Sequence, residues 1–359
     1  GIVSSFASKK KIKNEEIFIV SLFWLFLILS IFISIIFFIY LDEINKYFFV
    51  NKIQSNWIIF LFIISIPFQA ISLLFNAILN GKSEYKNVAS IGMITNVLTL
   101  IVSVFLMSKY NLQGAIIGLS LTSIIMFVIS CYYFFKIYAV TIFFQPFQFA
   151  KQEISPLLNY SLMSLVSIIM SFALSYYMRI TIINKFSLEY AGYYEAVLRI
   201  SGFYMIFINT FVSFYYLPEL AKCSSKEEVV KLTKEYYKKI FPLFFIGLVI
   251  LLLGIDFFIP FFFNKSFLVI TPFVKYQVFL DIIKSLYLIL GIRFFAFGKT
   301  KGFLLTEIFS FTINFILFII AMHFFDFQGV WYSQIASSFL YFIILIVTFK
   351  MYFKKNKLF

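Results

Sequence analysis

The sequence predicts an all-α integral membrane protein, with ten transmembrane helices in this chain. Hydrophobic residues make up 62% of the 359 residues and charged residues only 13%, whereas a soluble domain carries about 25% charged residues. Ten apolar segments reach the roughly 20 residues that a helix needs to cross a bilayer. The lysines between these segments fall mainly on one side of the expected membrane. Composition, segment length and charge distribution therefore predict the same class.

The ten segments follow one another through short connections. The longest connections, 41–56, 137–156 and 218–238, leave no room for a domain outside the membrane. We predict a short amphipathic helix on the cytoplasmic face in the last of these three. The expected spans are residues 17–40, 57–79, 88–107, 114–136, 157–183, 191–217, 239–262, 270–297, 302–324 and 329–350.

The positive charges predict the orientation. Twenty Lys and Arg residues fall on one side of the ten spans and five on the other, and five lie within the spans. Because positively charged loops stay in the cytoplasm, both ends of this chain are expected to be cytoplasmic. The net charge of +14 is then a topology signal, so nucleic acid is not an expected partner.

An internal repeat predicts two lobes. Asn80-Gly81-Lys82-Ser83 precedes Gln113-Gly114, and Phe297-Gly298-Lys299-Thr300 precedes Gln328-Gly329. Matching Gly81 to Gly298 gives an offset of 217 residues, and six spans separate the copies. An even number of spans gives both copies the same topology, as in transporters built from parallel repeats. The alternative is a chance similarity among apolar helices.

The offset also predicts the domain boundaries. The second copy starts near residue 155, so the first copy would start about 60 residues before residue 1, with two further spans. We therefore expect twelve spans in two pseudo-symmetric six-helix lobes. Residues 1–136 would be an N-lobe with four of its spans, 137–156 a linker, and 157–359 a six-span C-lobe.

Several classes of chemistry lack the residues they need. The two cysteines, Cys131 and Cys223, and the single histidine, His323, offer no metal spacing, disulfide framework or catalytic pair. The sequence also has no glycine-rich phosphate loop. We expect no cofactor, no metal site and no catalytic residue.

All three arginines of the chain, Arg179, Arg199 and Arg293, lie inside predicted spans. A charge in the hydrocarbon zone is expensive and marks a substrate or ion path, and the guanidinium matches phosphate oxygens well. Each arginine also has a simpler interpretation. Arg179 and Arg293 could extend to the outer and inner surfaces, and Arg199 could pair with Glu195 four residues earlier.

The 270–297 span carries a polar face. Gln277, Asp281 and Lys284 lie within about 60° of one another on a helix, with Lys284 near mid-depth. We expect Lys284 to meet a phosphate and Asp281 to exchange a proton or sodium; a local pair between the two is the alternative. Glu307 has no partner three or four residues away, which makes it a protonation candidate or a partner for a cation on another helix.

Several motifs of the chain recur in a known family. They are Leu157-Leu158 with Tyr160, Arg179, Ala191-Gly192-Tyr193-Tyr194 leading to Arg199, Pro218-Glu219-Leu220-Ala221-Lys222, residues 76–87, and the opening Gly1-Ile2-Val3. With these motifs the chain resembles Wzx-type polysaccharide flippases, in the multidrug/oligosaccharidyl-lipid/polysaccharide (MOP) exporter superfamily, and from residue 157 it resembles their second lobe. Those relatives often place an acidic residue before the basic residue at the end of the first span, where this chain has Met178, so a coupling role for that acid does not carry over.

The resemblance implies a MATE-like fold in the bacterial inner membrane. The implied function is to move an undecaprenyl-pyrophosphate-linked oligosaccharide repeat unit, as in O-antigen synthesis, from the cytoplasmic to the periplasmic leaflet. Alternating access driven by H⁺ or Na⁺ would do this, with the bilayer and other polysaccharide-assembly membrane proteins as partners. The predicted substrate-binding residues are Arg179, Arg199, Lys284 and Arg293, and the predicted ion-coupling residues are Asp281, Glu307 and Glu195.

Two other functions compete. A cation-coupled exporter of drugs or small molecules should carry more acids than cations in its cavity, whereas the spans here hold five cations and four acids. A polysaccharide polymerase or glycosyltransferase needs a large outer loop or an acid cluster in a loop. The outer loops reach at most 16 residues and hold only Asp42, Glu43, Glu189 and Asp326, so an enzyme is not expected.

Overall fold

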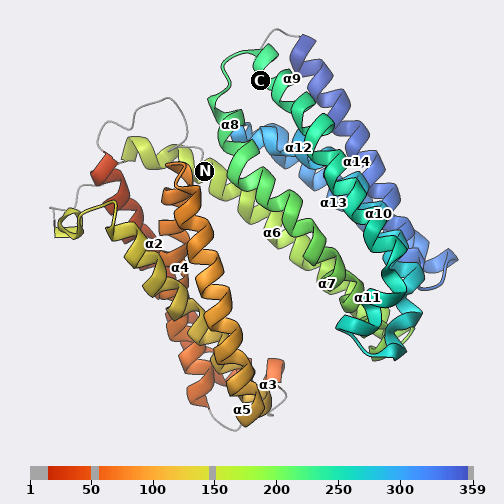
Figure 1. Cartoon of the computed structure of the whole chain (residues 1–359), viewed down its shortest axis with the longest axis horizontal. Helices are drawn as coiled ribbons and strands as arrows, with labels where there is room; N and C mark the ends of the chain where they lie inside the picture. Colours follow the sequence, from red (N-terminus) through yellow and green to blue (C-terminus); the bar gives the residue numbers. More distant parts are fainter. Residues whose placement is uncertain (1–14, 50–55, 145–150, 355–359) are drawn as a thin grey trace. The chain divides into compact units, whose positions relative to one another are not determined.

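The computed structural model describes residues 15–49, 56–144 and 151–354. This described part contains helices and no strand. The chain divides into two compact units, residues 2–157 and 158–359, which we call the N-terminal and C-terminal units (Figure 1). The N-terminal lysines, the centre of the predicted linker at 145–150 and the last lysines of the tail lie outside the described residues. The predicted lobe boundaries stay a prediction.

The N-terminal unit is a small bundle. Its longest element, α5, contains two helices, because the backbone leaves the helical region at Asn111 with φ 48° and ψ −125°. α4 packs against α2 and α5, and the rings of Phe75 and Phe134 stack 4.0 Å apart at that contact. The elements are α2 (Glu15–Ile39), α3 (Leu41–Phe49), α4 (Asn56–Gly81), α5 (Tyr85–Phe135) and a 3₁₀ turn, η1 (Val140–Phe144).

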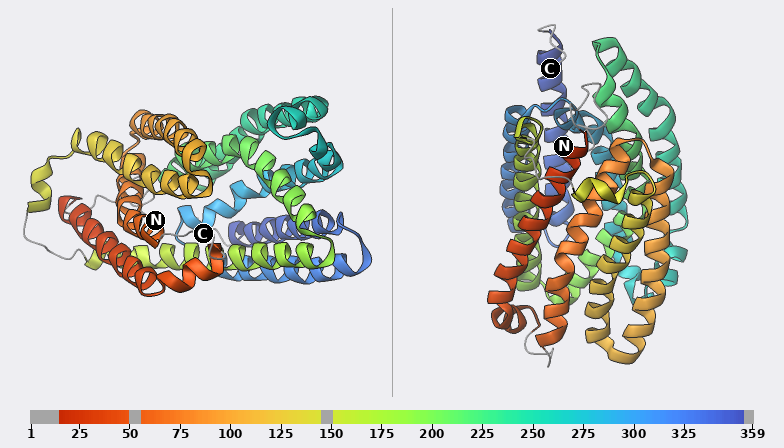
Figure 2. Two further views of the ribbon diagram at one scale, coloured as in Figure 1. Left: turned by 90° about the horizontal axis from the view of Figure 1, so that it is seen from below. Right: turned by 90° about the vertical axis from the view of Figure 1, so that its left-hand side faces the viewer.

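The C-terminal unit holds the candidate site. α14 packs against both α12 and α13, and α13 and α14 run side by side (Figure 2). Its elements are α6 (Lys151–Lys185), α7 (Leu188–Phe211), η2 (Val212–Tyr216), α8 (Leu217–Lys222), α9 (Lys226–Glu235), η3 (Tyr236–Ile240), α10 (Phe241–Leu253), α11 (Ile255–Phe262), η4 (Lys265–Ile270), α12 (Thr271–Ala296), α13 (Thr300–Phe324) and α14 (Gly329–Lys354).

The connection at 218–238 contains the predicted short amphipathic helix, α9, but this helix is not separate from its neighbour. Through the π-helical turn η2, α7 and α8 form one helix of 35 residues, and through η3, α9 and α10 form one of 28 residues. The turn between them ends in a capping box at Ser225 and Glu228. Val229, Thr233 and Tyr236 are buried on one face of α9 and η3. With that buried face α9 packs inside the C-terminal unit, and through η3 it continues into α10.

Nine helices of the described chain are long and apolar enough to cross a membrane. The predicted span 270–297 forms the 26-residue helix α12, which is not among the nine. Its four charged residues, Lys275, Asp281, Lys284 and Arg293, are spread along the helix, which distinguishes it from the nine. α12 is also extensively buried, against α7, α10, α13 and α14. The count of ten spans therefore stays a prediction, and the helix in question is an interior one.

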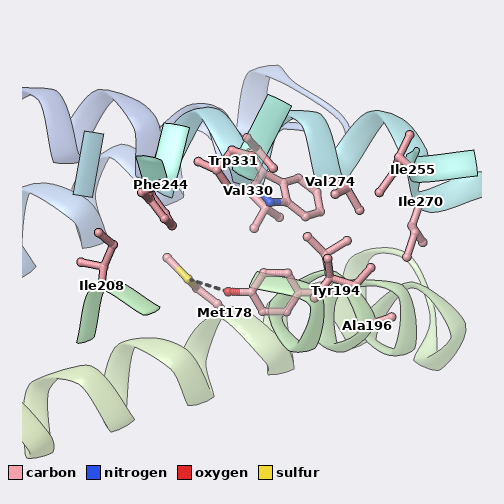
Figure 3. Packing of buried hydrophobic residues seen from close by; sticks show 14 of the residues in the cluster. Met178, Tyr194, Ala196, Ile208, Phe244, Ile255, Ile270, Val274, Val330 and Trp331 are labelled. Atoms are coloured by element: carbon pink, nitrogen blue, oxygen red, sulfur yellow. Dashed lines mark hydrogen bonds between the residues drawn. The ribbon is translucent and has the colours of Figure 1, made fainter. Parts of the chain in front are cut away.

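The core of the C-terminal unit forms where α7, α12 and α14 meet (Figure 3). Trp331 is fully buried, and its ring stacks on that of Phe273 at 4.9 Å. The Tyr194 hydroxyl donates to the Met178 sulfur at 3.9 Å and joins α7 to α6. Lipid is as apolar as leucine, so helices in a membrane associate through close packing and hydrogen bonds. The polar groups inside this core therefore contribute to specifying the fold.

The two repeat segments share a turn, but their register differs from the one expected. The turn after α4 has Ser83 at φ 64°, and the turn after α12 has Gly298 at φ 63°. In each turn the positive-φ residue donates its N–H to the carbonyl three residues earlier, and the next residue donates to the carbonyl five residues earlier. This is the Schellman motif that ends helices. The equivalent residues are therefore Ser83 and Gly298, an offset of 215 rather than 217.

Two glycines support the offset of 215. A Cβ atom on Gly114 would lie 2.1 Å from the Leu106 carbonyl oxygen, and one on Gly329 would lie 2.8 Å from the Ala321 carbonyl oxygen. Each glycine lies eight positions after the residue whose carbonyl oxygen its Cβ atom would meet, and the two glycines are 215 residues apart. The matching of Gly-Lys-Ser to Gly-Lys-Thr was thus wrong by two residues, because the shared feature is a backbone conformation and not a tripeptide.

Candidate functional site: a buried carboxylate on α12

Asp281 is the centre of a polar cluster inside the C-terminal unit. Its side chain is 1% exposed. From α7, Ser201 Oγ donates to Oδ2 at 2.5 Å and the Tyr204 hydroxyl donates to the same oxygen at 2.7 Å. From one turn earlier on α12, Gln277 Nε2 donates to both carboxylate oxygens, at 3.0 and 3.1 Å. These neutral donors replace the hydrogen bonds to water that the carboxylate loses when it is buried.

Lys284 supplies the counter-charge. Its Nζ lies 3.3 Å from Asp281 Oδ1, and its side chain is 32% exposed whereas that of Asp281 is 1% exposed. The local pair that the sequence left open is therefore present. Because the carboxylate is buried and the lysine is partly exposed, the pair has one fixed member and one that a ligand can reach. The spacing of Gln277, Asp281 and Lys284 on one helical face accounts for their grouping.

α7 and α14 complete the cluster, and the residues that they contribute were not predicted. Trp331 on α14 donates from Nε1 to Gln277 Oε1 at 3.0 Å. That bond fixes the amide of Gln277, so that its nitrogen faces the Asp281 carboxylate. The only sequence signal was a pair of hydroxyls, Ser201 and Tyr204, three residues apart in the predicted span 191–217. A tryptophan in an apolar helix gives no signal of this kind.

Arg293 is buried, so the expectation that it extends to the inner surface is wrong. Its side chain is 4% exposed, and Nη2 donates to Thr233 Oγ1 of α9 at 2.7 Å. The guanidinium also lies over the ring of Phe349, 5.0 Å from the centroid. The α9–α10 helix packs over Arg293, and its Thr233 hydroxyl is the acceptor beside the buried guanidinium. Arg293 lies nine residues beyond Lys284, which is roughly 13 Å along the helix, so the two cations do not share one site.

Arg179 and Glu195 form an ion pair between α6 and α7. Both side chains are about two-fifths exposed, at 39% each. The expected local pair between Glu195 and Arg199 is therefore wrong. α6 and α7 form a hairpin whose turn is only two residues long, which brings Arg179 opposite Glu195. Arg199 is exposed on α7.

Glu307 lies in separate surroundings. Tyr341 donates its hydroxyl to Oε1 at 3.0 Å, and Ser167 Oγ approaches Oε2 at 3.4 Å. Among the described residues, the partners of Glu307 on other helices are therefore these hydroxyl groups and not the cation that the sequence suggested. Of the seven predicted site residues, the structure brings together Asp281 with Lys284 and Arg179 with Glu195, and it keeps Arg199, Arg293 and Glu307 apart from both pairs.

The comparisons with known proteins decide the family. A family model described as "Polysaccharide biosynthesis protein" matches residues 1–272. The chain belongs to this polysaccharide biosynthesis family. The resemblance proposed from the sequence is thereby confirmed at the level of the family. A search of curated protein sequences finds no match.

Solved structures confirm the MATE-like fold. An outward-facing multidrug resistance MATE transporter of the MOP superfamily aligns with a TM-score of 0.79 at 16% identity, over 99% of this chain and 83% of its own. The lipid II flippase MurJ aligns with a TM-score of 0.69 at 18% identity, over 98% and 77%. The MATE transporter ClbM, solved with Rb⁺, gives a TM-score of 0.70 at 10% identity, over 96% and 81%. The chain therefore combines membership of the polysaccharide biosynthesis family with the fold of these transporters.

Proposed function

We propose that this protein flips an undecaprenyl-pyrophosphate-linked oligosaccharide repeat unit from the cytoplasmic to the periplasmic leaflet by alternating access. The family supports the pathway, and one observation carries the mechanism. A buried carboxylate, Asp281, holds a partly exposed ammonium, Lys284, on the interior helix α12. A diphosphate cannot cross hydrocarbon alone, because an unpaired buried ion costs many kcal/mol. Lys284 offers it a counter-charge within the spans.

The pair also gives a route to ion coupling. When a phosphate oxygen draws Lys284 away, Asp281 stays 1% exposed with only neutral donors around it. A buried charge without its partner is strongly unfavourable. Uptake of H⁺ or Na⁺ at Asp281 restores neutrality and favours the phosphate-bound state. Occupancy of Asp281 by an ion and binding of the diphosphate at Lys284 are thereby linked, each changing the affinity for the other.

The remaining predicted residues take secondary roles in this proposal. Arg199 is the exposed guanidinium of α7 and is the most accessible arginine for a second phosphate contact. Arg179 already has a carboxylate partner in Glu195, so it binds an anion only when that pair opens. Arg293 is held inside the unit and acts on the position of α9. Glu195 and Glu307 are the other two candidates for ion coupling.

The location and partners follow from the same proposal. The lipid-linked substrate is made on the cytoplasmic face of the bacterial inner membrane, so we place the protein there with both ends of this chain in the cytoplasm. The distribution of lysines among the connections supports that orientation. Other membrane proteins of polysaccharide assembly would supply the repeat unit and receive it.

Deletion of the gene in its native host tests the function. We expect loss of surface polysaccharide on a gel, with single lipid-linked units accumulating on the cytoplasmic leaflet of the inner membrane. Unchanged polymer with altered sensitivity to cationic drugs would favour the exporter instead. Units that reach the periplasm but stay unpolymerised would favour a polymerase.

Complementation of the deletion with variants tests the mechanism. Lys284→Ala should abolish polymer and Lys284→Arg should restore part of it, because a guanidinium also binds phosphate. The matched control is Lys275→Ala, which removes an exposed lysine from the same helix. Full transport by the Lys284→Ala protein, at wild-type abundance in the membrane, would remove Lys284 from the mechanism.

A further inference from the structure

The exposed side of α9 and η3 is strongly basic. α9 lies at one end of the C-terminal unit and α11 at the other (Figure 1). An open hollow of about 550 Å³ on the exposed side is lined by five lysines and two glutamates. Within the described residues, four of these lysines are exposed and form no ion pair with a carboxylate, so this side favours an anionic partner. The lysines are Lys226 and the four without an ion pair, Lys231, Lys234, Lys238 and Lys239.

The lysines nearest α10 lie at the level of the lipid headgroups. α9, η3 and α10 form one helix, Lys226–Leu253, and the predicted span begins at Lys239. The headgroup region adds roughly 5–7 Å to each side of the hydrocarbon core of a bilayer. At about 1.5 Å per residue, Lys238 and Lys234 lie roughly 2 and 8 Å beyond the start of the span, whereas Lys226 lies about 20 Å beyond it. Lipid phosphates can therefore meet Lys238 and Lys239, but not Lys226.

A smaller groove beside these lysines separates α9 and η3 from α7 and η2. It has a volume of about 180 Å³ and shares Glu235 and Lys239 with the basic hollow. Its other lining residues are aromatic or aliphatic, and Tyr215 among them is 46% exposed. Tyrosine is enriched where a protein crosses the boundary between lipid and water. The apolar lining consists of Phe211, Tyr215, Leu232, Tyr236 and Ile240.

Hydrogen bonds to α12 hold the wall of this groove in place. Tyr236 is buried, and its hydroxyl donates to the Ser285 carbonyl oxygen at 3.0 Å. The Tyr237 hydroxyl donates to the Leu286 carbonyl oxygen at 2.7 Å. η2 and η3 are both π-helical turns, which are rare and frequently found at functional sites. A groove fixed in this way is already formed before a ligand binds, which lowers the entropy lost on binding.

We propose that the groove between α7 and α9 binds the headgroup of an anionic phospholipid, with its phosphate at Lys238 and Lys239 and its glycerol backbone against Tyr215. Its acyl chains would then follow α7 and α10 into the hydrocarbon. Basic pockets between membrane helices bind acidic phospholipids in this way. The headgroup of phosphatidylglycerol carries hydroxyls that can donate to Glu235, so this carboxylate does not exclude it.

Charge excludes two other occupants of the basic surface. The connections that the predicted topology places on the same side of the membrane are rich in lysine, so another segment of this chain would be repelled. A second copy of the same surface would be repelled for the same reason. The groove contains none of the residues proposed for transport, so this inference does not depend on the proposed function.

Native mass spectrometry of the full-length protein in detergent micelles tests the proposal. The probe is phosphatidylglycerol, and phosphatidylcholine with the same acyl chains is the reference lipid. We expect the first phosphatidylglycerol to bind the wild type at least tenfold more tightly than the first phosphatidylcholine. The double variant Lys238→Gln, Lys239→Gln should lose this preference. Lys226→Gln is the matched control and should keep it, because it removes an exposed lysine of the same helix that lies beyond the headgroups.

Tyr215→Ala distinguishes a built groove from general attraction between charges. The substitution removes an exposed ring from the lining of the groove and leaves every lysine in place. We expect at least a threefold loss of affinity for phosphatidylglycerol in the folded variant, judged by its elution in size-exclusion chromatography. Wild-type affinity in this variant would mean that charge alone is recognised, and it would overturn the groove as a site.

An acidic protein segment is the alternative occupant, and it would use the full length of α9. A poly-glutamate peptide is its probe, and the double variant Lys226→Gln, Lys231→Gln is the matching change. Weaker binding of the peptide to this variant, together with equal affinity of the wild type for the two lipids, would identify a protein-docking surface and refute the lipid site. An undiminished preference for phosphatidylglycerol in Lys238→Gln, Lys239→Gln would refute it as well.

Discussion

Removing the charge of Lys284 measures how much its ammonium group stabilises the buried carboxylate of Asp281. In Lys284→Met the carboxylate stays buried, at 1% exposure, without its counter-charge. Removing one partner of a buried pair costs about 3–5 kcal/mol. Lys284 is 32% exposed and three neutral donors remain, so solvent and hydrogen bonds recover part of this cost. We expect the free energy of unfolding to fall by about 2–3 kcal/mol.

The opposite substitution should cost less. Asp281→Asn leaves no buried charge, and Lys284 can turn its ammonium toward the exterior. The hydroxyls of Ser201 and Tyr204 then lose a charged acceptor. We expect the free energy of unfolding to fall by about 1–2 kcal/mol. The double variant also contains no buried charge and should cost about as much as Asp281→Asn alone. The two substitutions should therefore be non-additive by about 2 kcal/mol.

The assay is reversible unfolding in mixed micelles, with the four proteins of the cycle measured under one condition. Lys275→Met is the control, because it removes an exposed lysine from the same helix and should cost less than about 0.5 kcal/mol. Additivity of the two single variants within that margin would refute the claim that Lys284 neutralises a buried carboxylate. A cost of Lys275→Met equal to that of Lys284→Met would refute it as well.

Three further predictions concern the framework of the site. Ser83→Gly should stabilise the protein by about 1 kcal/mol, and Gly298→Ser should destabilise it by about 1–2 kcal/mol, because each residue occupies a positive-φ position that favours glycine; paired thermal unfolding scans check both. Trp331→Phe should cost about 1–3 kcal/mol by leaving the Gln277 carbonyl buried without its donor, and an unchanged unfolding midpoint would contradict this. Gly114→Ala should fail to accumulate in the membrane, because its new methyl group would lie 2.1 Å from a backbone oxygen; normal abundance on an immunoblot would contradict the close approach.

The polar face of α12 could be predicted from the sequence because its spacing is local. Residues 277, 281 and 284 lie on one side of any α-helix, and an acid and a base three residues apart can reach each other. Their neighbours on α7 and α14 could not be predicted in the same way. Ser201, Tyr204 and Trp331 meet Asp281 and Gln277 only through the packing of three helices, and no spacing along the chain encodes that contact.

The failed predictions share a cause. A pair of Glu195 with Arg199, its neighbour on the same helix, was one alternative, but the short hairpin of α6 and α7 places Arg179 opposite Glu195. An extension of Arg293 to the surface was the other, because hydropathy does not indicate that α9 continues into α10 and covers Arg293. Glu195 thus pairs with a residue of another helix in place of a neighbour on its own helix. Arg293 bonds to a residue of another helix in place of water.

α12 joins these observations to the proposed mechanism. In a membrane the outside of a protein is as apolar as its core, so hydropathy does not sort helices into buried and exposed. Polar groups therefore decide which helices are buried, because these groups must lie where other helices can supply their hydrogen-bond partners. α12 carries Gln277, Asp281 and Arg293 buried, and other helices pack around it. In the proposed mechanism a change of charge at Lys284 acts on this helix, because the hydrogen bonds from α7 and α14 to Asp281 and Gln277 and the hydrogen bond from Arg293 to α9 all involve α12.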